Sequence, residues 1–215
     1  MTNNSKVRIC VMVSGGGTNL QALIDCQEKG MMPSGEIALV ISNKADAYAL
    51  ERAKNHNIPA FAISKKELGM KAFEKAVLGK MAEYGIELVV FAGFLCIVSE
   101  NFIKCLPERI VNIHPSLIPA FCGKGMYGLK VHEAALERGV KCTGATVHMV
   151  NEIPDGGRIL YQKPVRILKN DTPETLQRRV MEQAEWILLP KAVEELSKEI
   201  RRKGDTYAPV RYCDL

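Results

Sequence analysis

The sequence lacks the segments that mark a membrane or secreted protein. Its longest apolar run, from Leu88 to Val98, is far shorter than the ~20 residues needed to span a bilayer. The polar start, Met1 to Lys6, has no apolar signal-peptide core. The seven cysteines include no Cys-x-x-Cys pair, and their odd number argues against a complete disulfide framework. We therefore expect a cytoplasmic protein without a membrane partner, in which Cys10 and Cys142, in or beside apolar runs, are buried.

Two other kinds of partner are also disfavoured. The net charge of +5 is modest and spread along the chain, which suits small anions better than nucleic acid. The histidines at 56, 114, 132 and 148 have neither His-x-x-x-His nor His-x-His spacing, so we expect no metal. We expect His56 on the surface, His148 in the core or supporting a functional group, and His132 as a brace for the loop that precedes it. The sequence leaves open whether the chain is a monomer or a homodimer.

Apolar runs alternate with amphipathic stretches along the chain. This alternation predicts an α/β fold, a Rossmann-like, mostly parallel twisted sheet with flanking helices. We expect strands at 7–13, 37–42, 60–63, 88–92, 110–114, 143–150 and 158–165, the last a candidate antiparallel strand. We expect helices at 19–29, 48–55, 71–84 and 130–138, and an irregular loop at 115–128. A last helix should start at Thr172-Pro173, where Thr172 can cap it, and run toward Leu196 with a bend at Pro190.

A glycine-rich turn, Ser14-Gly-Gly-Gly-Thr-Asn19, follows the first predicted strand and opens a helix. Glycines let a backbone approach a phosphate, and a helix N-terminus supplies free N–H groups. The turn matches neither Gly-x-Gly-x-x-Gly, because Leu20 occupies the third glycine position, nor a Walker motif, because the lysine is missing. It therefore predicts a phosphate monoester site. The alternative is a tight turn capped by Thr18 or Asn19.

The richest candidate site combines an amide, an imidazole and a carboxylate. Asn112 and His114 end an apolar strand and, two residues apart, point to the same face. Such a pair can polarise a carbonyl and stabilise the oxyanion that forms on it. Asp155, in Asp155-Gly-Gly157, can hold the imidazole protonated, although on its own this segment would be an ordinary turn. The set predicts an acyl-transfer site.

Several motifs together resemble the glycinamide ribonucleotide formyltransferases of the formyltransferase superfamily, and the resemblance runs from Val7 to about Leu196. The motifs are Ser14-Gly-Gly-Gly-Thr-Asn19, Ser42-Asn-Lys-Ala-Asp46, Leu50-Glu-Arg-Ala53, Ala92-Gly-Phe94, Asn112-Ile-His-Pro-Ser-Leu117 and Asp155-Gly-Gly157. The resemblance implies formyl transfer from 10-formyltetrahydrofolate to the glycine amine of the ribonucleotide in purine (IMP) biosynthesis, with no metal. It also implies one formyltransferase domain over residues 1–203, with a phosphate-binding N-terminal half and a folate-binding C-terminal half, and a tail at 204–215.

The resemblance assigns roles to single residues. Asn112, His114 and Asp155 would be catalytic. Ribonucleotide binding would use Gly17, Thr18, Asn19 and Glu185, the last accepting hydrogen bonds from the ribose. Folate binding would use Leu95, Cys96, Ile97, Val98, Asn112 and Pro154.

The chain departs from the family pattern where the folate tail would bind. Cys96 stands where some members carry arginine, and a second basic position falls close to Met70, with Lys66 and Lys71 nearby. Within the 115–128 loop, the segment Ala120–Gly128 is longer than a common Pro-Gly form, and its Lys124 could reach an anion. The sequence therefore leaves open which cation meets the tail, whether this loop moves, and how pH tunes His114.

Three rival functions remain open. Methionyl-tRNA formyltransferase would need a C-terminal tRNA-binding domain, and we expect little chain after the last helix. Formyltetrahydrofolate hydrolase would usually carry an N-terminal regulatory domain, whereas the first strand is expected at Val7. A nonenzymatic nucleotide-binding domain would use the glycine turn alone and leave the carbonyl-polarising pair unexplained.

Overall fold

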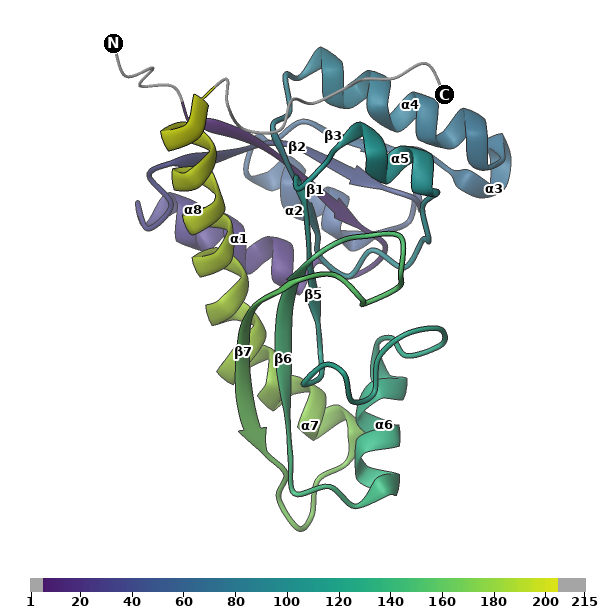
Figure 1. Ribbon diagram of the computed structural model, residues 1–215, viewed down its shortest axis with the longest axis vertical. Coiled ribbons are helices and arrows are strands. Elements are labelled where there is room, and N and C mark those ends of the chain that lie inside the picture. The colour runs from purple at the N-terminus through teal and green to yellow at the C-terminus, as the bar shows by residue number, and fades with distance from the viewer. Residues whose placement is uncertain (1–5, 205–215) are drawn as a thin grey trace.

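The computed structural model describes residues 6–204, and their centre is one seven-stranded sheet of order β3-β2-β1-β4-β5-β6-β7 (Figure 1). The strands are β1 (Val7–Val13), β2 (Gly35–Ser42), β3 (Ala60–Ala62), β4 (Leu88–Phe91), β5 (Ile110–His114), β6 (Cys142–Met149) and β7 (Ile159–Arg166). Strands β1 to β5 run parallel to one another, β6 is antiparallel to β5, and β7 is antiparallel to β6. The expected α/β class, the mostly parallel sheet and the antiparallel last strand are confirmed.

Helices cover both faces of the sheet. They are α1 (Thr18–Glu28), α2 (Tyr48–Asn55), α3 (Lys65–Leu68), α4 (Met70–Glu83), α5 (Glu100–Cys105), α6 (Leu129–Arg138), α7 (Pro173–Val180) and α8 (Trp186–Lys203). Figure 1 shows α1 and α8 on one side of the sheet and α4 and α5 on the other. Strand β1 serves both cores, since Ile9 and Val11 pack on the α1 and α8 side while Cys10 and Met12 face α4. This two-sided burial explains the apolar run from Ile9 to Val13.

The last helical stretch differs from the expected single helix bent at Pro190. Thr172 caps α7 in a capping box with Thr175, as expected for the start. A π-helical turn, η1 (Met181–Glu185), then separates α7 from α8. Pro190 lies inside α8 without ending it. The irregularity thus falls at the wide turn that carries Glu185, and π turns of this kind are frequent at functional sites.

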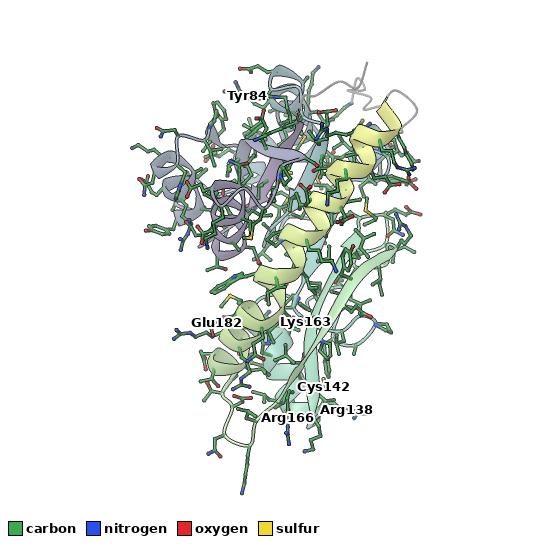
Figure 2. The ribbon with its side chains drawn as sticks, turned by 90° about the vertical axis from the view of Figure 1, so that its left-hand side faces the viewer. Tyr84, Arg138, Cys142, Lys163, Arg166 and Glu182 are labelled. Carbon is green, nitrogen blue, oxygen red and sulfur yellow. The ribbon has the colours of Figure 1, made fainter. Side chains whose placement is uncertain are left out.

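Cysteine burial was predicted correctly at one of two positions. Cys10 is fully buried, whereas Cys142 is exposed, so that expectation was wrong. The reason is position in the sheet, because β6 begins at the end of the molecule far from the core. Figure 2 shows Arg138, Cys142 and Arg166 together at that end, opposite Tyr84. The six cysteines of the described part of the chain are free thiols, and none of its helices is long and apolar enough to cross a membrane.

The carboxyl ends of the parallel strands position the candidate site. The glycine turn follows β1, Asn43 follows β2, the segment 92–99 follows β4, and the 115–128 loop follows β5. Adjacent parallel strands end at one edge, where open α/β sheets bind ligands. The predicted tail overlaps the structure at Gly204 alone, and residues 205–215 lie outside the described part.

Candidate active site

Strand β5 presents Asn112 and His114 on one face, opposite β6. In the antiparallel register Asn112 pairs with His148 and His114 with Thr146. Nδ2 of Asn112 lies 3.0 Å from Nε2 of His148, whose Nδ1 lies 2.8 Å from the Met149 carbonyl oxygen. Because a carbonyl oxygen only accepts, Nδ1 donates in the contact with Met149, and Nε2 faces both the Asn112 amide and, at 3.6 Å, a carboxylate oxygen of Asp155. His148 therefore orients Asn112, the supporting role expected for it.

The imidazole of His114 is buried between two segments of loop. It is 4% exposed, and its Nε2 donates to the carbonyl oxygen of Phe121 at 2.9 Å. Its Nδ1 lies 3.6 Å from a carboxylate oxygen of Asp155. Burial lowers the pKa of His114 below its ordinary value, and the nearby Asp155 carboxylate and the Phe121 carbonyl only partly oppose this. Burial therefore works against the protonated imidazole that Asp155 can favour, and the net effect on the pKa of His114 is downward.

Asp155 reaches the strand residues from the loop after β6. It adopts a left-handed backbone with φ 56°, and one carboxylate oxygen accepts from the Gly123 N–H at 2.8 Å. The other oxygen lies 3.6 Å from Nε2 of His148. Burial alone would raise the pKa of Asp155, but His148, His114 and the Gly123 N–H together hold it below its usual value. The three sequence-predicted catalytic residues therefore meet, with Asp155 ionised.

The glycine turn leaves the start of α1 without a side-chain cap. Gly17 caps α1 with φ 72° and no side-chain hydrogen bond, so the cap by Thr18 or Asn19 considered from the sequence is not formed. A Cβ on Gly17 would lie 2.6 Å from Cβ of Ala49, which shows how closely α2 packs on the turn. Arg52 donates to the carbonyl oxygen of Gly16 at 2.8 Å. The first N–H groups of α1 remain available to a ligand.

Asn19 and Glu185 form the second polar pair near this turn. The Asn19 amide donates to Glu185 at 2.6 Å, and both side chains are buried. Burial raises the pKa of Glu185 to about 7, and the Asn19 hydrogen bond only partly opposes this. Thr18 lies against Met181, 3.5 Å from its sulfur. The π-helical turn thus brings Glu185 to the residues with which it was grouped.

One cleft of about 390 Å³ joins these groups. Its lining includes most of the residues predicted for the site: Thr18, Asn19, Leu95, Cys96, Ile97, Asn112, His114, Pro154, Asp155 and Glu185. Val98 lines a smaller neighbouring cavity of about 130 Å³, together with Ile97, Asn112 and Asp155. The structure therefore brings both predicted binding sets to one site, except that Gly17 contributes only backbone beside it.

Reasoning from sequence missed part of this arrangement. His132, expected to brace the loop, is fully buried beside the cleft with both ring nitrogens unpartnered, and burial lowers its pKa to about 4. The carbonyl of Phe121 and the N–H of Gly123 contact the predicted catalytic side chains, but backbone groups leave no sequence signal. His56 is not the plain surface residue expected, because it is half-buried and lies 2.6 Å from Glu28. Within residues 6–204 no group of side chains is arranged to hold a metal.

The rim near Cys96 carries a cation that the sequence had not singled out. Nζ of Lys65 donates to the carbonyl oxygen of Ile97 at 3.2 Å. Burial raises the pKa of the Cys96 thiol, and Lys65 only partly offsets this. Leu95 and Ile97 are exposed beside it. An apolar rim with an adjacent ammonium group suits a ligand that has an aromatic body and an anionic end.

Comparison with known proteins shows which family the chain resembles. Residues 7–193 match the family model described as formyl transferase. A phosphoribosylglycinamide formyltransferase of Haemophilus influenzae is 37% identical over 94% of this chain and 92% of its own. A chloroplastic phosphoribosylglycinamide formyltransferase of Arabidopsis thaliana is 40% identical over 81% of this chain, which spans only 60% of that relative. The crystal structure of glycinamide ribonucleotide transformylase 1 from Symbiobacterium toebii superposes with a TM-score of 0.84 at 40% identity, covering 90% of this chain and 89% of that one.

Proposed function

The chain belongs to the formyl transferase family, and from this premise we propose that it transfers a formyl group from 10-formyltetrahydrofolate to the glycine amine of glycinamide ribonucleotide. This is a step of de novo purine biosynthesis. The observation that carries the proposal is one cleft with an uncapped helix N-terminus at one end and Asn112, His114 and Asp155 at the other. A reducing, cytoplasm-like compartment suits the free cysteines of the described residues.

The ribonucleotide is proposed to bind at the first end. Its phosphate would accept from the free N–H groups at Gly17, Thr18 and Asn19, where the helix dipole also favours an anion. Glu185 would accept hydrogen bonds from the ribose hydroxyls, because its buried carboxylate already faces this part of the cleft. Because the pKa of Glu185 is raised to about 7, a fraction of the protein molecules carries a protonated Glu185 near neutral pH. In those molecules Glu185 must lose its proton before both of its oxygens can accept hydrogen bonds.

The folate is proposed to bind along the segment Leu95–Val98 and near Pro154. Its aromatic part would pack on the apolar rim, and its anionic tail would meet the ammonium group of Lys65, in place of the arginine absent at Cys96. Lys124, which lines the same cleft from the 115–128 loop, is a second cation within the site.

The chemistry follows from the positions of the three catalytic side chains. The glycine amine attacks the formyl carbon, a C–N bond forms, and the carbonyl oxygen becomes an oxyanion. Asn112, oriented by His148, and His114 would donate hydrogen bonds to that oxygen. The new negative charge favours protonation of His114, which burial alone opposes. Asp155, ionised beside it, would relay the amine proton through water to N10 of the folate as the bond from N10 to carbon breaks.

A spectrophotometric assay tests the proposed function directly. A 10-formylfolate analogue is supplied with and without glycinamide ribonucleotide, and deformylated folate is followed over time. We expect turnover only when the ribonucleotide is present. Turnover without it would instead identify a formyltetrahydrofolate hydrolase. Phosphate binding without turnover in either arm would identify a nonenzymatic binding domain.

A further inference from the structure

Ser14 and Asn43 have no role in the chemistry above, and they meet in one partly buried hydrogen-bond relay. Ser14 opens the glycine turn and is 4% exposed. Its hydroxyl donates to Oδ1 of Asn43 at 2.6 Å and accepts from the backbone N–H of Leu95 at 2.8 Å. Asn43 follows β2, Ser14 follows β1 and Leu95 lies beyond β4, so the relay ties together the ends of three adjacent strands. It is separate from Asn112, His114 and Asp155.

Asn43 is presented to this relay by a turn built from its own motif. The hydroxyl of Ser42, which is fully buried, donates to the carbonyl oxygen of Lys44 at 2.8 Å and lies 3.0 Å from the Lys44 N–H. This local hydrogen bonding fixes the chain direction directly after β2. The turn formed by Ser42 and Lys44 therefore holds Asn43 in position to accept from the Ser14 hydroxyl.

The relay has a defined direction. An amide oxygen can only accept, so the single hydroxyl proton of Ser14 must point to Asn43. The oxygen lone pairs of Ser14 are then left for Leu95, whose N–H can only donate. Without Asn43 the hydroxyl could rotate, and without Ser14 the Leu95 N–H would lose this partner.

The segment that the relay holds is the one that lines the proposed folate site. Residues 94–99 have no regular secondary structure, so side-chain contacts fix their path. At the far end, the buried carboxylate of Glu74 accepts from both the N–H and the hydroxyl of Ser99, at 2.6 and 2.7 Å. The Glu74 contact ties the segment to α4, whereas the Ser14 contact ties it to the glycine turn.

We propose that Ser14, oriented by Asn43, is a positioning residue that fixes the folate-binding segment to the ribonucleotide-binding turn and so links the two substrate sites. The inference rests on the proposed function, because it takes the ligands of the two ends from it. One hydroxyl joins the turn to the segment, so a phosphate that restricts the motion of the turn, without changing its shape, also steadies Leu95. Each substrate then strengthens binding of the other, by the same factor in both directions.

The test compares Ser14→Ala with a matched control, Ser197→Ala. Ser197 is likewise a buried serine, but it lies in α8 and its hydroxyl donates to the Val193 carbonyl oxygen. For Ser14→Ala we expect KM for the formylfolate to rise about tenfold, as for the loss of one well-placed hydrogen bond, and kcat to change less. The control should leave both constants within about twofold of wild type.

Two further measurements separate positioning from general weakening. Asn43→Asp keeps an acceptor for the Ser14 proton and should leave KM for the formylfolate near the wild-type value. Asn43→Leu removes that acceptor and should raise this KM as Ser14→Ala does. Hydrogen exchange followed by mass spectrometry should show faster exchange of residues 92–99 in Ser14→Ala and not in Ser197→Ala. In wild type, an unreactive folate analogue should tighten ribonucleotide binding measured by calorimetry, and Ser14→Ala should remove that effect.

The outcomes distinguish this inference from the proposed function. If wild type transfers formyl groups to the ribonucleotide but Ser14→Ala leaves KM, exchange and mutual binding unchanged, the inference is wrong and the function stands. If wild type shows no transfer, the proposed function fails. The exchange measurement, which needs no substrate, then still decides whether Ser14 holds residues 92–99.

Discussion

The two loops that border the site are fastened in opposite ways. The glycine turn at 14–19 is held by groups outside the chemistry: Asn43 on Ser14, the Ala49 N–H on the carbonyl oxygen of Gly15, and Arg52 on Gly16. The second half of the other loop, 121–128, is fastened to two of the proposed catalytic residues themselves. Phe121 accepts from His114, and Gly123 donates to Asp155.

This difference means that the glycine turn can bind a ligand as it stands, whereas His114 must first exchange a hydrogen-bond partner. An anion can enter the glycine turn without breaking any hydrogen bond named above. An oxyanion that takes the proton donor of His114 must compete with the carbonyl of Phe121, because both need the same N–H. We infer that substrate binding replaces contacts of segment 121–128, while the glycine turn keeps its shape.

The sharpest way to break this comparison is to remove the catalytic side chains. His114→Ala or Asp155→Asn should lower kcat by about 10²- to 10³-fold, since each removes part of the oxyanion and proton-transfer machinery. The dissociation constant for the ribonucleotide, measured by calorimetry, should stay near the wild-type value, because the glycine turn does not depend on either residue. A fully active His114→Ala protein would overturn the catalytic assignment.

The opposite substitution damages the glycine turn. Gly17→Ala places a Cβ 2.6 Å from Ala49 at φ 72°, so both overpacking and a left-handed backbone cost free energy. We expect the free energy of unfolding to fall by about 4 kcal/mol, from about 1–2 for the backbone and the rest for packing. KM for the ribonucleotide should rise roughly tenfold to a hundredfold, because the phosphate-binding N–H groups shift.

Gly30→Ala is the matched control for that experiment. Gly30 has nearly the same φ, 71°, but its added Cβ would meet nothing within 4 Å. It should therefore lose only the backbone contribution of about 1–2 kcal/mol in urea unfolding and keep a normal KM. Equal losses in both variants would show that α2 does not pack rigidly on the turn.

The sequence predicted the framework of this site better than its contacts. Apolar runs located the strands because a buried parallel sheet needs continuous apolar sequence, and Thr172 with Pro173 located the start of α7. The pairing of His148 with Asn112 depends on antiparallel register between β5 and β6, which local sequence does not encode. The helix α5 was not anticipated either, since it is only six residues long.

Glu185 shows the same limit for a residue assigned through the family resemblance. Its neighbour Asn19 lies 166 positions away in sequence, and the π-helical turn that aims it inward has no marker comparable to a proline or glycine. Physical inference from local pattern could place both residues on helices but could not bring them together.

Two buried groups beside the cleft, His132 in α6 and Glu185 in η1, have opposite effects on how stability depends on pH. Burial lowers the pKa of His132 from 6.5 to about 4, so the unfolded chain binds more protons there and stability rises with pH through this window. Burial raises the pKa of Glu185 from 4.5 to about 7, so the folded chain binds more protons and stability falls as pH rises. Between about pH 4.5 and 6.5 these two slopes oppose each other.

Replacing one of the two groups should reveal how the free energy of unfolding depends on pH through the other. In Glu185→Gln, the free energy of unfolding should rise by about 2–3 kcal/mol from pH 4.5 to 6.5, because His132 titrates alone and the lowered pKa of His114 acts in the same direction. In His132→Asn it should fall over the same range. Urea unfolding at three pH values checks both, and parallel curves in wild type and both variants would contradict the burial effects.

The smallest expected effect comes from Gly125→Ala and tests the loop that is fastened to the catalytic residues. Gly125 has φ 88° and open space at its Cβ, so the change resembles Gly17→Ala in backbone strain but not in packing. We expect segment 121–128 to rearrange locally without disturbing the sheet. The free energy of global unfolding should therefore change by less than about 0.5 kcal/mol. Formyl transfer should fall less than about threefold, with ribonucleotide binding unchanged. A loss of stability as large as that of Gly17→Ala would show that this segment is as integral to the fold as the glycine turn, and the distinction between the two loops would fail.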